Sequence, residues 1–158
     1  MVGIDEIEIS RLQRRKIESK ALIPFLAALR DKFGENAVQE VLDEVIRKLA
    51  VEDGARLAET YGQTTTSLRK VAEEVWAGGG SLDLELVGQS EGHLDFNVTR
   101  CGYAEYYKEM GLSDLGFRMH CNRDHAMLGG FNSELELSRT QTIMEGAVCC
   151  NFRYRKKS

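Results

Sequence analysis

The sequence has no long apolar run. No stretch approaches the roughly 18 consecutive apolar residues that a membrane-spanning helix needs. The N-terminal segment MVGIDEIEIS is acidic, whereas a secretory signal peptide begins with basic residues. We therefore expect a cytoplasmic protein with no membrane partner.

Positive charge is also scarce. The chain has 21 lysines and arginines against 25 acidic residues, which gives a net charge of −4. Its only basic runs, 14–16 and 153–157, are short and typical of solvated surface. Because nucleic-acid binding needs a concentrated basic face that contacts phosphates, we expect no nucleic-acid partner.

Closely paired cysteines are missing as well. The four cysteines, Cys101, Cys121, Cys149 and Cys150, form none of the C-x-x-C pairs that mark a structural zinc module. In the cytoplasm they are expected as free thiols. We predict no cofactor, and we keep as the alternative a zinc ion held by Cys101, Cys121 and Cys150.

What is present is the composition of an ordinary globular domain. The chain has 158 residues, of which 42% are hydrophobic and 29% are charged, with no internal repeat and no low-complexity segment. We expect a single domain over residues 1–158, with a helical half at 5–78 and a strand-rich half at 81–155.

Apolar residues recur at helical spacing in the first half. In residues 35–50 they predict one buried stripe made of Ala37, Val38, Val41, Leu42, Val45, Ile46 and Leu49. Gly54 is expected to bend or end this helix. The same wide apolar face could instead contact a second copy of the chain, so a homo-oligomer stays open.

Two further helices flank this one. Residues 20–34 predict a shorter amphipathic helix, in which Pro24 is acceptable if it falls in the first turn. Residues 64–80 predict a helix that three glycines end. Trp76, on the apolar face of that helix, is expected in the core.

After the glycines the apolar period changes from 3.6 to 2. Alternating runs predict strands at 82–88, 93–99, 134–139 and 147–155, with short helices near 102–111 and 122–129. Residues 88–92 have the length of a hairpin connection. Helices first and strands later indicate an α+β fold, with N-terminal helices packed on one face of an antiparallel sheet of about four strands.

The stretch MHCNRDHAM, residues 119–127, concentrates reactive side chains. On a helix, Cys121, Asp124 and His125 would share one face. A thiol beside an imidazole that a carboxylate orients is the arrangement that generates a thiolate nucleophile. The alternative places Asp124 in a local ion pair, Cys121 in the core as a small apolar residue and His125 in water.

Other thiols and polar groups are ambiguous from pattern alone. Cys101 opens a helix, whose dipole would lower its pKa, while burial would raise it. In the last strand one side carries Val148, Cys150, Phe152 and Tyr154. Cys150 is therefore a core thiol unless a site opens beneath the sheet. Asn151 and Arg153 face the other way, where Arg153 either clamps a carboxylate or lies on a solvated face.

Four ordered elements in residues 95–155 resemble one family. They are a cysteine that opens a helix (Cys101), a C-x-x-D step (Cys121, Asp124), an R-T-x-T-I-x-E-G turn (Arg139 to Gly146) and a terminal C-x-F-R (Cys150, Phe152, Arg153). Together they are similar to the L-2-amino-thiazoline-4-carboxylic acid hydrolase family. The terminal pattern is also faintly similar to small ligand-binding domains of the vinyl-reductase type.

The resemblance implies a hydrolase that opens a C–N bond of a small carboxylated heterocycle, such as a cyclic amidine. The substrate would be the small-molecule partner, attacked by a thiolate or by water that a carboxylate activates. The implied catalytic residues are Cys121 and Asp124, to which we add His125 and Cys150 as candidates. The implied substrate-binding residues are Arg139, Thr142, Asn151 and Arg153.

One departure from the family pattern matters. Family members usually read His-Cys-Asp-Phe-Arg near the C-terminus, whereas this chain has Cys149, Cys150, Asn151, Phe152 and Arg153. An asparagine cannot act as a base. The protein then uses Asp124 instead, has another substrate, or is a small-molecule-binding domain without catalysis. A zinc-dependent hydrolase that uses the cysteine cluster is a further alternative.

Overall fold

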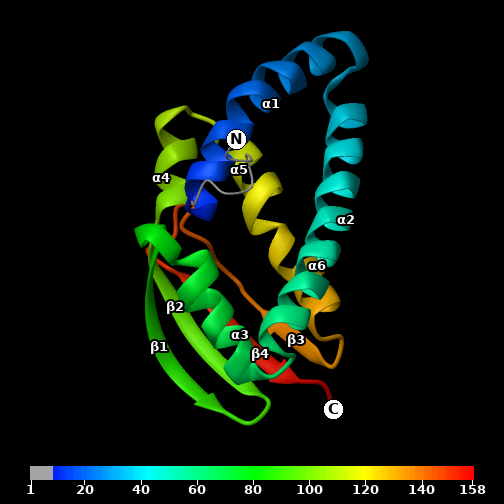
Figure 1. Ribbon diagram of the computed structural model, residues 1–158. Helices are drawn as coiled ribbons and strands as arrows, with labels where there is room; N and C mark the ends of the chain where they lie inside the picture. Colours follow the sequence, from blue (N-terminus) through cyan, green and yellow to red (C-terminus); the bar gives the residue numbers. More distant parts are fainter. Residues whose placement is uncertain (1–8) are drawn as a thin grey trace, which may run out of the picture.

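The computed structural model describes residues 9–158, and Figure 1 shows how their elements are arranged. The helical elements are α1 (Arg11–Phe33), α2 (Glu35–Tyr61), α3 (Thr65–Lys70), the π-helical η2 (Val71–Trp76), the 3-10 turn η3 (Gly78–Gly80), α4 (Gly102–Glu109), α5 (Ser113–Gly116), the π-helical η4 (Phe117–Cys121) and α6 (Arg123–Phe131). The strands are β1 (Leu82–Ser90), β2 (His93–Cys101), β3 (Leu135–Ser138) and β4 (Cys150–Lys156). The expected start of the helical half at residue 5 lies outside the described residues.

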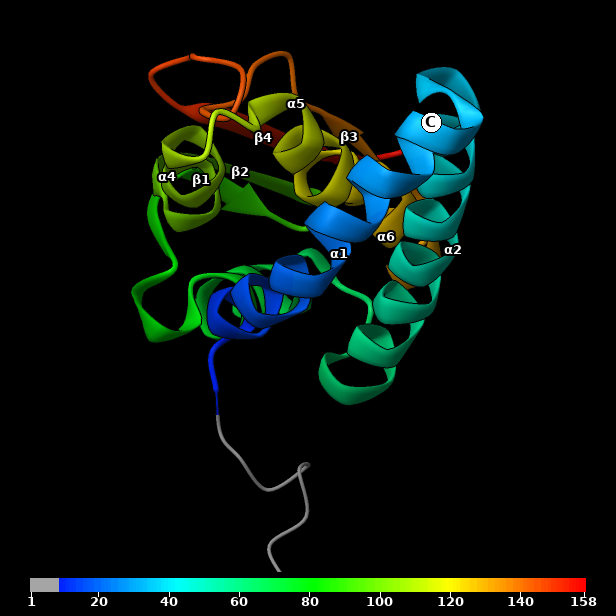
Figure 2. The same ribbon diagram turned by 90° about the horizontal axis from the view of Figure 1, so that it is seen from above.

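The strands form one antiparallel sheet in the order β1-β2-β4-β3. Helices α2, α3 and α6 lie on one side of it, as Figures 1 and 2 show together. This arrangement confirms the predicted α+β fold. A two-residue turn, Glu91-Gly92, joins β1 to β2, so the predicted hairpin is present with a shorter loop than expected.

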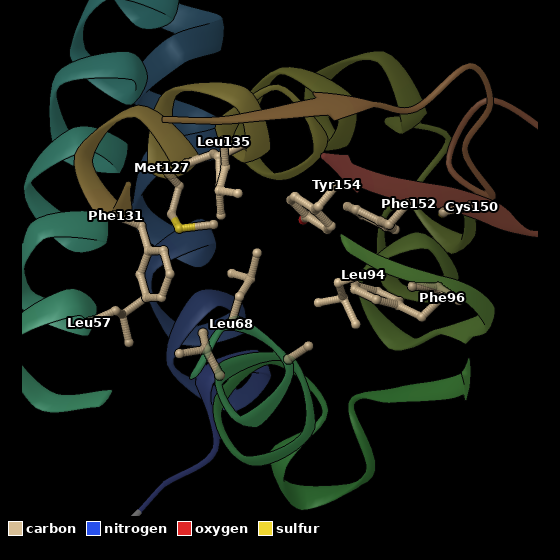
Figure 3. Packing of buried hydrophobic residues seen from close by; sticks show 14 of the residues in the cluster. Leu57, Leu68, Leu94, Phe96, Met127, Phe131, Leu135, Cys150, Phe152 and Tyr154 are labelled. Carbon is tan, nitrogen blue, oxygen red and sulfur yellow. The ribbon is translucent and has the colours of Figure 1, made fainter. Parts of the chain in front are cut away.

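Period-2 alternation selects the residues of the inner face of the sheet. Phe96 pairs with Phe152 across β2 and β4, and their rings stack with centroids 4.9 Å apart. Figure 3 shows these rings and Leu94 facing Leu68 and Met127 from the helices. The predicted parity holds for the strand itself. It is wrong for Val148, which is 89% exposed because β4 begins only at Cys150 and the two residues before it lie in a loop.

The second helix does not end or bend at Gly54 as expected. It continues to Tyr61, because Gly54 is where α2 crosses α6. A Cβ on Gly54 would overlap the carbonyl oxygen of Met127, and one on Gly130 would overlap the carbonyl oxygen of Val51. The two helices are thus in backbone contact through the later turns of α6, and Arg123 in its first turn approaches Asp53 of α2 to 3.9 Å.

Only part of the expected apolar stripe on α2 is buried. Val38, Leu42 and Ile46 are buried at intervals of four residues, whereas Val41 and Val45 are 62% and 48% exposed. The helix packs with one narrow face on its neighbours and leaves the adjacent apolar positions outside. The proposed homo-oligomer therefore stays a prediction.

The first helix is longer than expected. It begins at Arg11, where Ser10 and Gln13 form a capping box, so Pro24 lies in its interior and not in the first turn. Pro24 and Lys20 are both exposed. Water can therefore bond the Lys20 carbonyl that proline leaves without a donor, which makes the interior proline tolerable. No helix in residues 9–158 is long and apolar enough to cross a membrane.

Two hydrophobic clusters fill the interior. One lies between the sheet and α2, α3 and α6, and the other lies among α1, α2, α4, α5 and η4. Leu82, Cys101 and Ile143 pack against both clusters. The boundary between the clusters is where the candidate site opens.

Candidate functional site

A cavity of about 110 Å³ lies at the junction of the two clusters. Its walls are mostly apolar and aromatic, with a few charged groups and three thiols; they are formed by Arg11, Arg15, Asp53, Trp76, Leu82, Phe96, Val98, Cys101, Tyr103, His120, Cys121, Arg123, Asp124, Met127, Arg139, Thr142, Cys150 and Phe152. An apolar cavity of about 150 Å³ can hold benzene. The hollow therefore suits a ligand about the size of one small ring.

Asp124 and Arg139 form a buried ion pair in the wall of this cavity. The π-helical η4 ends at Cys121 and α6 begins two residues later, so Asp124 lies in the first turn of α6. Arg139 Nη1 donates to Asp124 Oδ2 and to the Cys121 carbonyl oxygen, the latter at 2.9 Å. The Arg139 guanidinium carbon also lies 5.7 Å from the ring centroid of Phe152. Arg139 thereby holds the carboxyl group in one orientation.

The Asp124 carboxyl has the properties of a general base. Burial raises its pKa to about 6, against the opposing charges of Arg139 and Arg123. Within residues 9–158 its Oδ1 accepts no hydrogen bond, and the side chain keeps 22% of its surface exposed. Oδ1 is thus available to accept a proton from a water molecule in the cavity.

The three cavity thiols are protonated at neutral pH. Burial raises the pKa of the Cys121 thiol far above its ordinary value, and the nearby Asp124 charge raises it further. Burial likewise raises the pKa of Cys150 to about 11. Cys101 caps α4 by accepting the Ala104 N–H at 3.4 Å, but burial still raises its pKa. None of the three is therefore an activated thiolate.

His120 is a cavity residue that the sequence analysis did not select. Its ring packs 5.1 Å from the ring centroids of Tyr103 and Tyr107, and its Nε2 lies 3.2 Å from the Tyr107 hydroxyl. Burial, together with the Arg15 and Arg123 charges, lowers the pKa of His120 to about 3. It is a neutral imidazole at physiological pH.

The mouth of the cavity carries three arginines. Arg11, Arg15, Arg123 and the single carboxylate Asp53 line both the cavity and a wider outer groove of about 1000 Å³. Sequence reasoning assigned Arg15 to a solvated basic run and gave Arg123 no role. The available signal was the position of Arg123 directly before Asp124.

The structure brings together five of the predicted site residues and leaves three apart. Cys121, Asp124, Arg139, Thr142 and Cys150 line the cavity. His125 does not line the cavity and is exposed. Cys121 ends the π-helical η4, whereas Asp124 and His125 lie in α6, so the three residues do not share one face of a single helix as expected.

Asn151 and Arg153 lie on the outer face of the sheet, outside the cavity wall. The Asn151 carboxamide oxygen accepts the backbone N–H groups of Thr140 and Gln141 at 3.0 and 3.1 Å. Arg153 donates to the Phe96 carbonyl and to Asn97 Oδ1 at 3.0 and 2.9 Å. Asn151 thus fixes the loop that follows β3, and Arg153 links the two central strands, β4 and β2.

The predicted thiol cluster does not form a metal site in the part of the chain that is described. No group of three or more histidine, cysteine, aspartate or glutamate side chains within residues 9–158 is arranged to hold one metal ion. Cys101, Cys121 and Cys150 share the cavity without converging on a common point.

Comparison with known proteins identifies a matching family by sequence and similar folds among solved structures. The profile of the L-2-amino-thiazoline-4-carboxylic acid hydrolase family matches residues 14–154. No curated protein matches the chain in sequence.

Two solved structures share the fold at low identity. One is trafficking protein particle complex subunit 3 from Naegleria fowleri covalently bound to palmitic acid, with a TM-score of 0.50, 13% identity and coverage of 90% of this chain and 97% of that one. The other is the phenol-responsive sensory domain of the transcription activator PoxR with phenol, with a TM-score of 0.50, 14% identity and coverage of 86% and 73%.

Proposed function

Because the chain belongs to the L-2-amino-thiazoline-4-carboxylic acid hydrolase family, we propose that it opens a C–N bond of a small carboxylated heterocycle. The observation that carries the proposal is the Asp124 carboxyl, whose pKa burial raises to about 6 inside a ring-sized cavity. A general base works best when its pKa lies near the working pH. Asp124 is the catalytic residue of the proposal.

The reaction consumes one water molecule and no other reactant. Asp124 takes a proton from water as the water oxygen bonds to the amidine carbon, and the ring nitrogen gains a proton from solvent. The tetrahedral carbon then forms its C=O bond, the C–N bond breaks, and the electron pair goes to the ring nitrogen. Asp124 returns its proton to that nitrogen, and the hydroxyl proton leaves to solvent.

Arg139 acts through Asp124 and is a positioning residue. Its ion pair occupies Oδ2 and leaves Oδ1 without a hydrogen bond from residues 9–158. Thr142 lines the same cavity, and its hydroxyl donates to Glu145 Oε2 at 2.7 Å while accepting the Glu145 N–H at 3.2 Å. Thr142 thereby braces the turn that carries Arg139 into the wall.

Water attack is favoured over a thiolate route by electrostatics. A thiolate at Cys121 would form beside the Asp124 carboxylate and away from water, and both effects raise the thiol pKa. The same burial makes Asp124 a stronger base.

A small-molecule-binding domain without catalysis is the second candidate. The specific observation in its favour is the aromatic and aliphatic wall formed by Trp76, Phe96 and Phe152. The two similar structures were solved with phenol and with palmitic acid, which are ligands with apolar bodies. Binding and catalysis would use the same cavity, so turnover separates them.

The test is incubation with L-2-amino-thiazoline-4-carboxylic acid, followed by mass spectrometry for a product heavier by one water. Asp124→Asn should lower kcat by about 10²–10⁴-fold, the usual contribution of a general base. Cys121→Ser is the matched cavity variant and should retain turnover. Circular dichroism checks that each variant folds, because Asp124→Asn leaves Arg139 without its carboxylate.

Each outcome assigns a function. Full activity of Asp124→Asn with loss in Cys121→Ser would overturn the carboxylate mechanism in favour of the thiolate. Binding of the compound by the wild type without any turnover would favour the binding domain.

A further inference from the structure

The arginines at the cavity mouth differ in how closely they bond the Asp53 carboxylate. Arg11 donates to both oxygens of Asp53, at 2.7 and 3.3 Å, and Arg56 donates to one of them at 3.4 Å. The nearest approach of Arg123 to the same carboxylate is 3.9 Å, beyond hydrogen-bond distance. Asp53, the acidic residue that lines both the cavity and the outer groove, is therefore bonded mainly to Arg11.

Arg123 is a nearly buried cation without a hydrogen-bond acceptor. Its side chain is 11% exposed, and its guanidinium donates no hydrogen bond to any other residue within 9–158. A guanidinium has five N–H donors, and those of Arg123 are free to bond water or a ligand at the mouth of the cavity. Burial and the nearby Arg15 charge lower the pKa of Arg123 to about 10, which still leaves it cationic at neutral pH.

Arg15 adds a second positive charge beside the first. Its side chain lines the cavity and is 21% exposed, and its carboxylate partner, Glu18, is 46% exposed at the rim. An exposed pair of this kind contributes little. Arg15 and Arg123 both line the cavity and the outer groove, so the two guanidiniums share the mouth between these hollows.

Tyr103 supplies a neutral donor at the same place. Its hydroxyl lines the cavity and has no hydrogen-bond partner among residues 9–158. Burial raises the pKa of Tyr103 to about 12, against the charges of Arg11, Arg15 and Arg123, so the hydroxyl keeps its proton. Arg123 and the Tyr103 hydroxyl thus donate no hydrogen bond to another residue within 9–158, and Arg15 is paired only with the half-exposed carboxylate of Glu18.

We propose that Arg123 and Arg15, with the Tyr103 hydroxyl, bind the carboxylate of the substrate at the mouth of the cavity. This assignment rests on the proposed function for the identity of the substrate. A carboxylate accepts two parallel hydrogen bonds from a guanidinium and offsets the mutual repulsion of the two cations. The ring of the substrate then enters the apolar interior toward Asp124, while Arg139 remains paired with that residue.

Arg153 and Arg139, the arginines that the sequence analysis expected to bind the substrate, are less suitable for its carboxylate. Arg153 lies outside the cavity wall and already donates to Asn97 and to backbone carbonyls. Arg139 uses Nη1 for both Asp124 and the Cys121 carbonyl, while its buried Nε has no hydrogen-bond partner within residues 9–158. A substrate carboxylate at Arg139 would compete with the group that is proposed to activate water.

The test measures binding and does not depend on turnover. The probes are thiazolidine-4-carboxylate, which has the ring and the acid but no amidine carbon to hydrolyse, and its uncharged carboxamide. Isothermal titration calorimetry of the full chain should show that the wild type binds the acid about tenfold more tightly than the amide, because hydrogen bonds to charged groups are strong. Arg123→Gln and Arg15→Gln should abolish this preference, and Arg123→Lys should restore part of it.

Arg47→Gln is the matched control, since Arg47 is an exposed arginine of α2 outside the cavity wall. It should keep the wild-type preference, and Tyr103→Phe should reduce that preference while leaving the amide affinity unchanged. Equal binding of acid and amide by the wild type, or an unchanged preference in a folded Arg123→Gln, overturns the assignment. An acid preference that depends on Arg123 in a protein without hydrolytic activity keeps this inference and removes the proposed function.

Discussion

Asp124 and Cys121 lie three positions apart and line the same cavity, yet burial has opposite consequences for their chemistry. It raises the pKa of both groups. For the thiol this removes the nucleophile, because the thiolate is the reactive form. For the carboxyl it produces a base that is largely ionised at neutral pH and stronger than an ordinary aspartate. The predicted association of the two residues is found, while the structure supports a role for one of them only.

The rate of ring opening should rise with pH through about 6 and level off above it. The ionised carboxylate of Asp124 is the base, and below a pKa of about 6 it is protonated and inactive. The measurement is kcat/KM between about pH 5 and 8, with the unfolded fraction followed in parallel. A profile that instead rises only in the range of a cysteine thiol would contradict the assignment.

Asn151 shows what a sequence departure can and cannot predict at this scale. An asparagine in place of the family aspartate was expected to remove a base or to change the substrate. Asn151 instead accepts two backbone N–H groups of the loop after Arg139 and lies outside the cavity wall. Residue type predicted its hydrogen-bonding ability and strand parity predicted its face, but only the structure shows that the cavity lies against the opposite face.

At the scale of elements, the contact between α2 and α6 positions the site. Gly54 and Gly130 allow backbone contact at the crossing, and this contact holds the first turn of α6 near Asp53. Sequence periodicity predicted both helices, although it treated Gly54 as a breaker. A glycine in a helix can mark a crossing as well as an end, and the choice depends on a neighbour that is distant in sequence.

Gly130→Ala should destabilise the fold by about 1–3 kcal/mol, the usual cost of overpacking. The added methyl group would overlap the Val51 carbonyl oxygen and force α2 and α6 apart. Urea unfolding measures the change in free energy. The control is Gly129→Ala in the same helix, where an added Cβ meets no atom within 4 Å. It should be neutral or slightly stabilising, and equal losses in both variants would contradict the crossing.

At the scale of the whole molecule, the two faces of the sheet differ in polarity and in what they contact. The inner face builds one hydrophobic cluster and a wall of the cavity, whereas the outer face carries a polar network centred on Asp95. Arg155 donates to both oxygens of Asp95, the longer bond being 2.9 Å. These contacts join β2 to β4 on the outer face, while Phe96 and Phe152 of the inner face line the cavity.

Asp95→Asn should lower the free energy of unfolding by about 1 kcal/mol at neutral pH, a value discounted for the solvent screening of half-exposed Arg155. Hydrogen bonds from Arg155 and His93 lower the pKa of Asp95 to about 2, against the effect of burial. A lowered carboxyl pKa stabilises the fold above the unfolded value of 3.8, and this stabilisation is lost as pH falls toward 2.

Acid unfolding followed by circular dichroism checks this prediction. The stability curves of wild type and Asp95→Asn should differ at neutral pH and converge in strong acid. Glu73→Gln, which removes the exposed i, i+4 pair between Arg69 of α3 and Glu73 of η2, is the control and should shift stability little at any pH. Curves that stay parallel down to low pH would contradict the role of Asp95.

Local sequence pattern predicted the types of the helices and strands, and with them the α+β class. It also predicted the alternation of β2 and β4 and singled out the stretch that contains Cys121 and Asp124. These features depend on spacing along the chain, which the backbone periods of helix and strand convert directly into faces. The composition of the cavity mouth depends on packing. Arg15 comes from α1, Asp53 from α2 and Arg123 from α6. Their meeting, and the burial that raises the pKa of Asp124 and of the cavity thiols, follow from how the two clusters pack against each other, which no local period encodes.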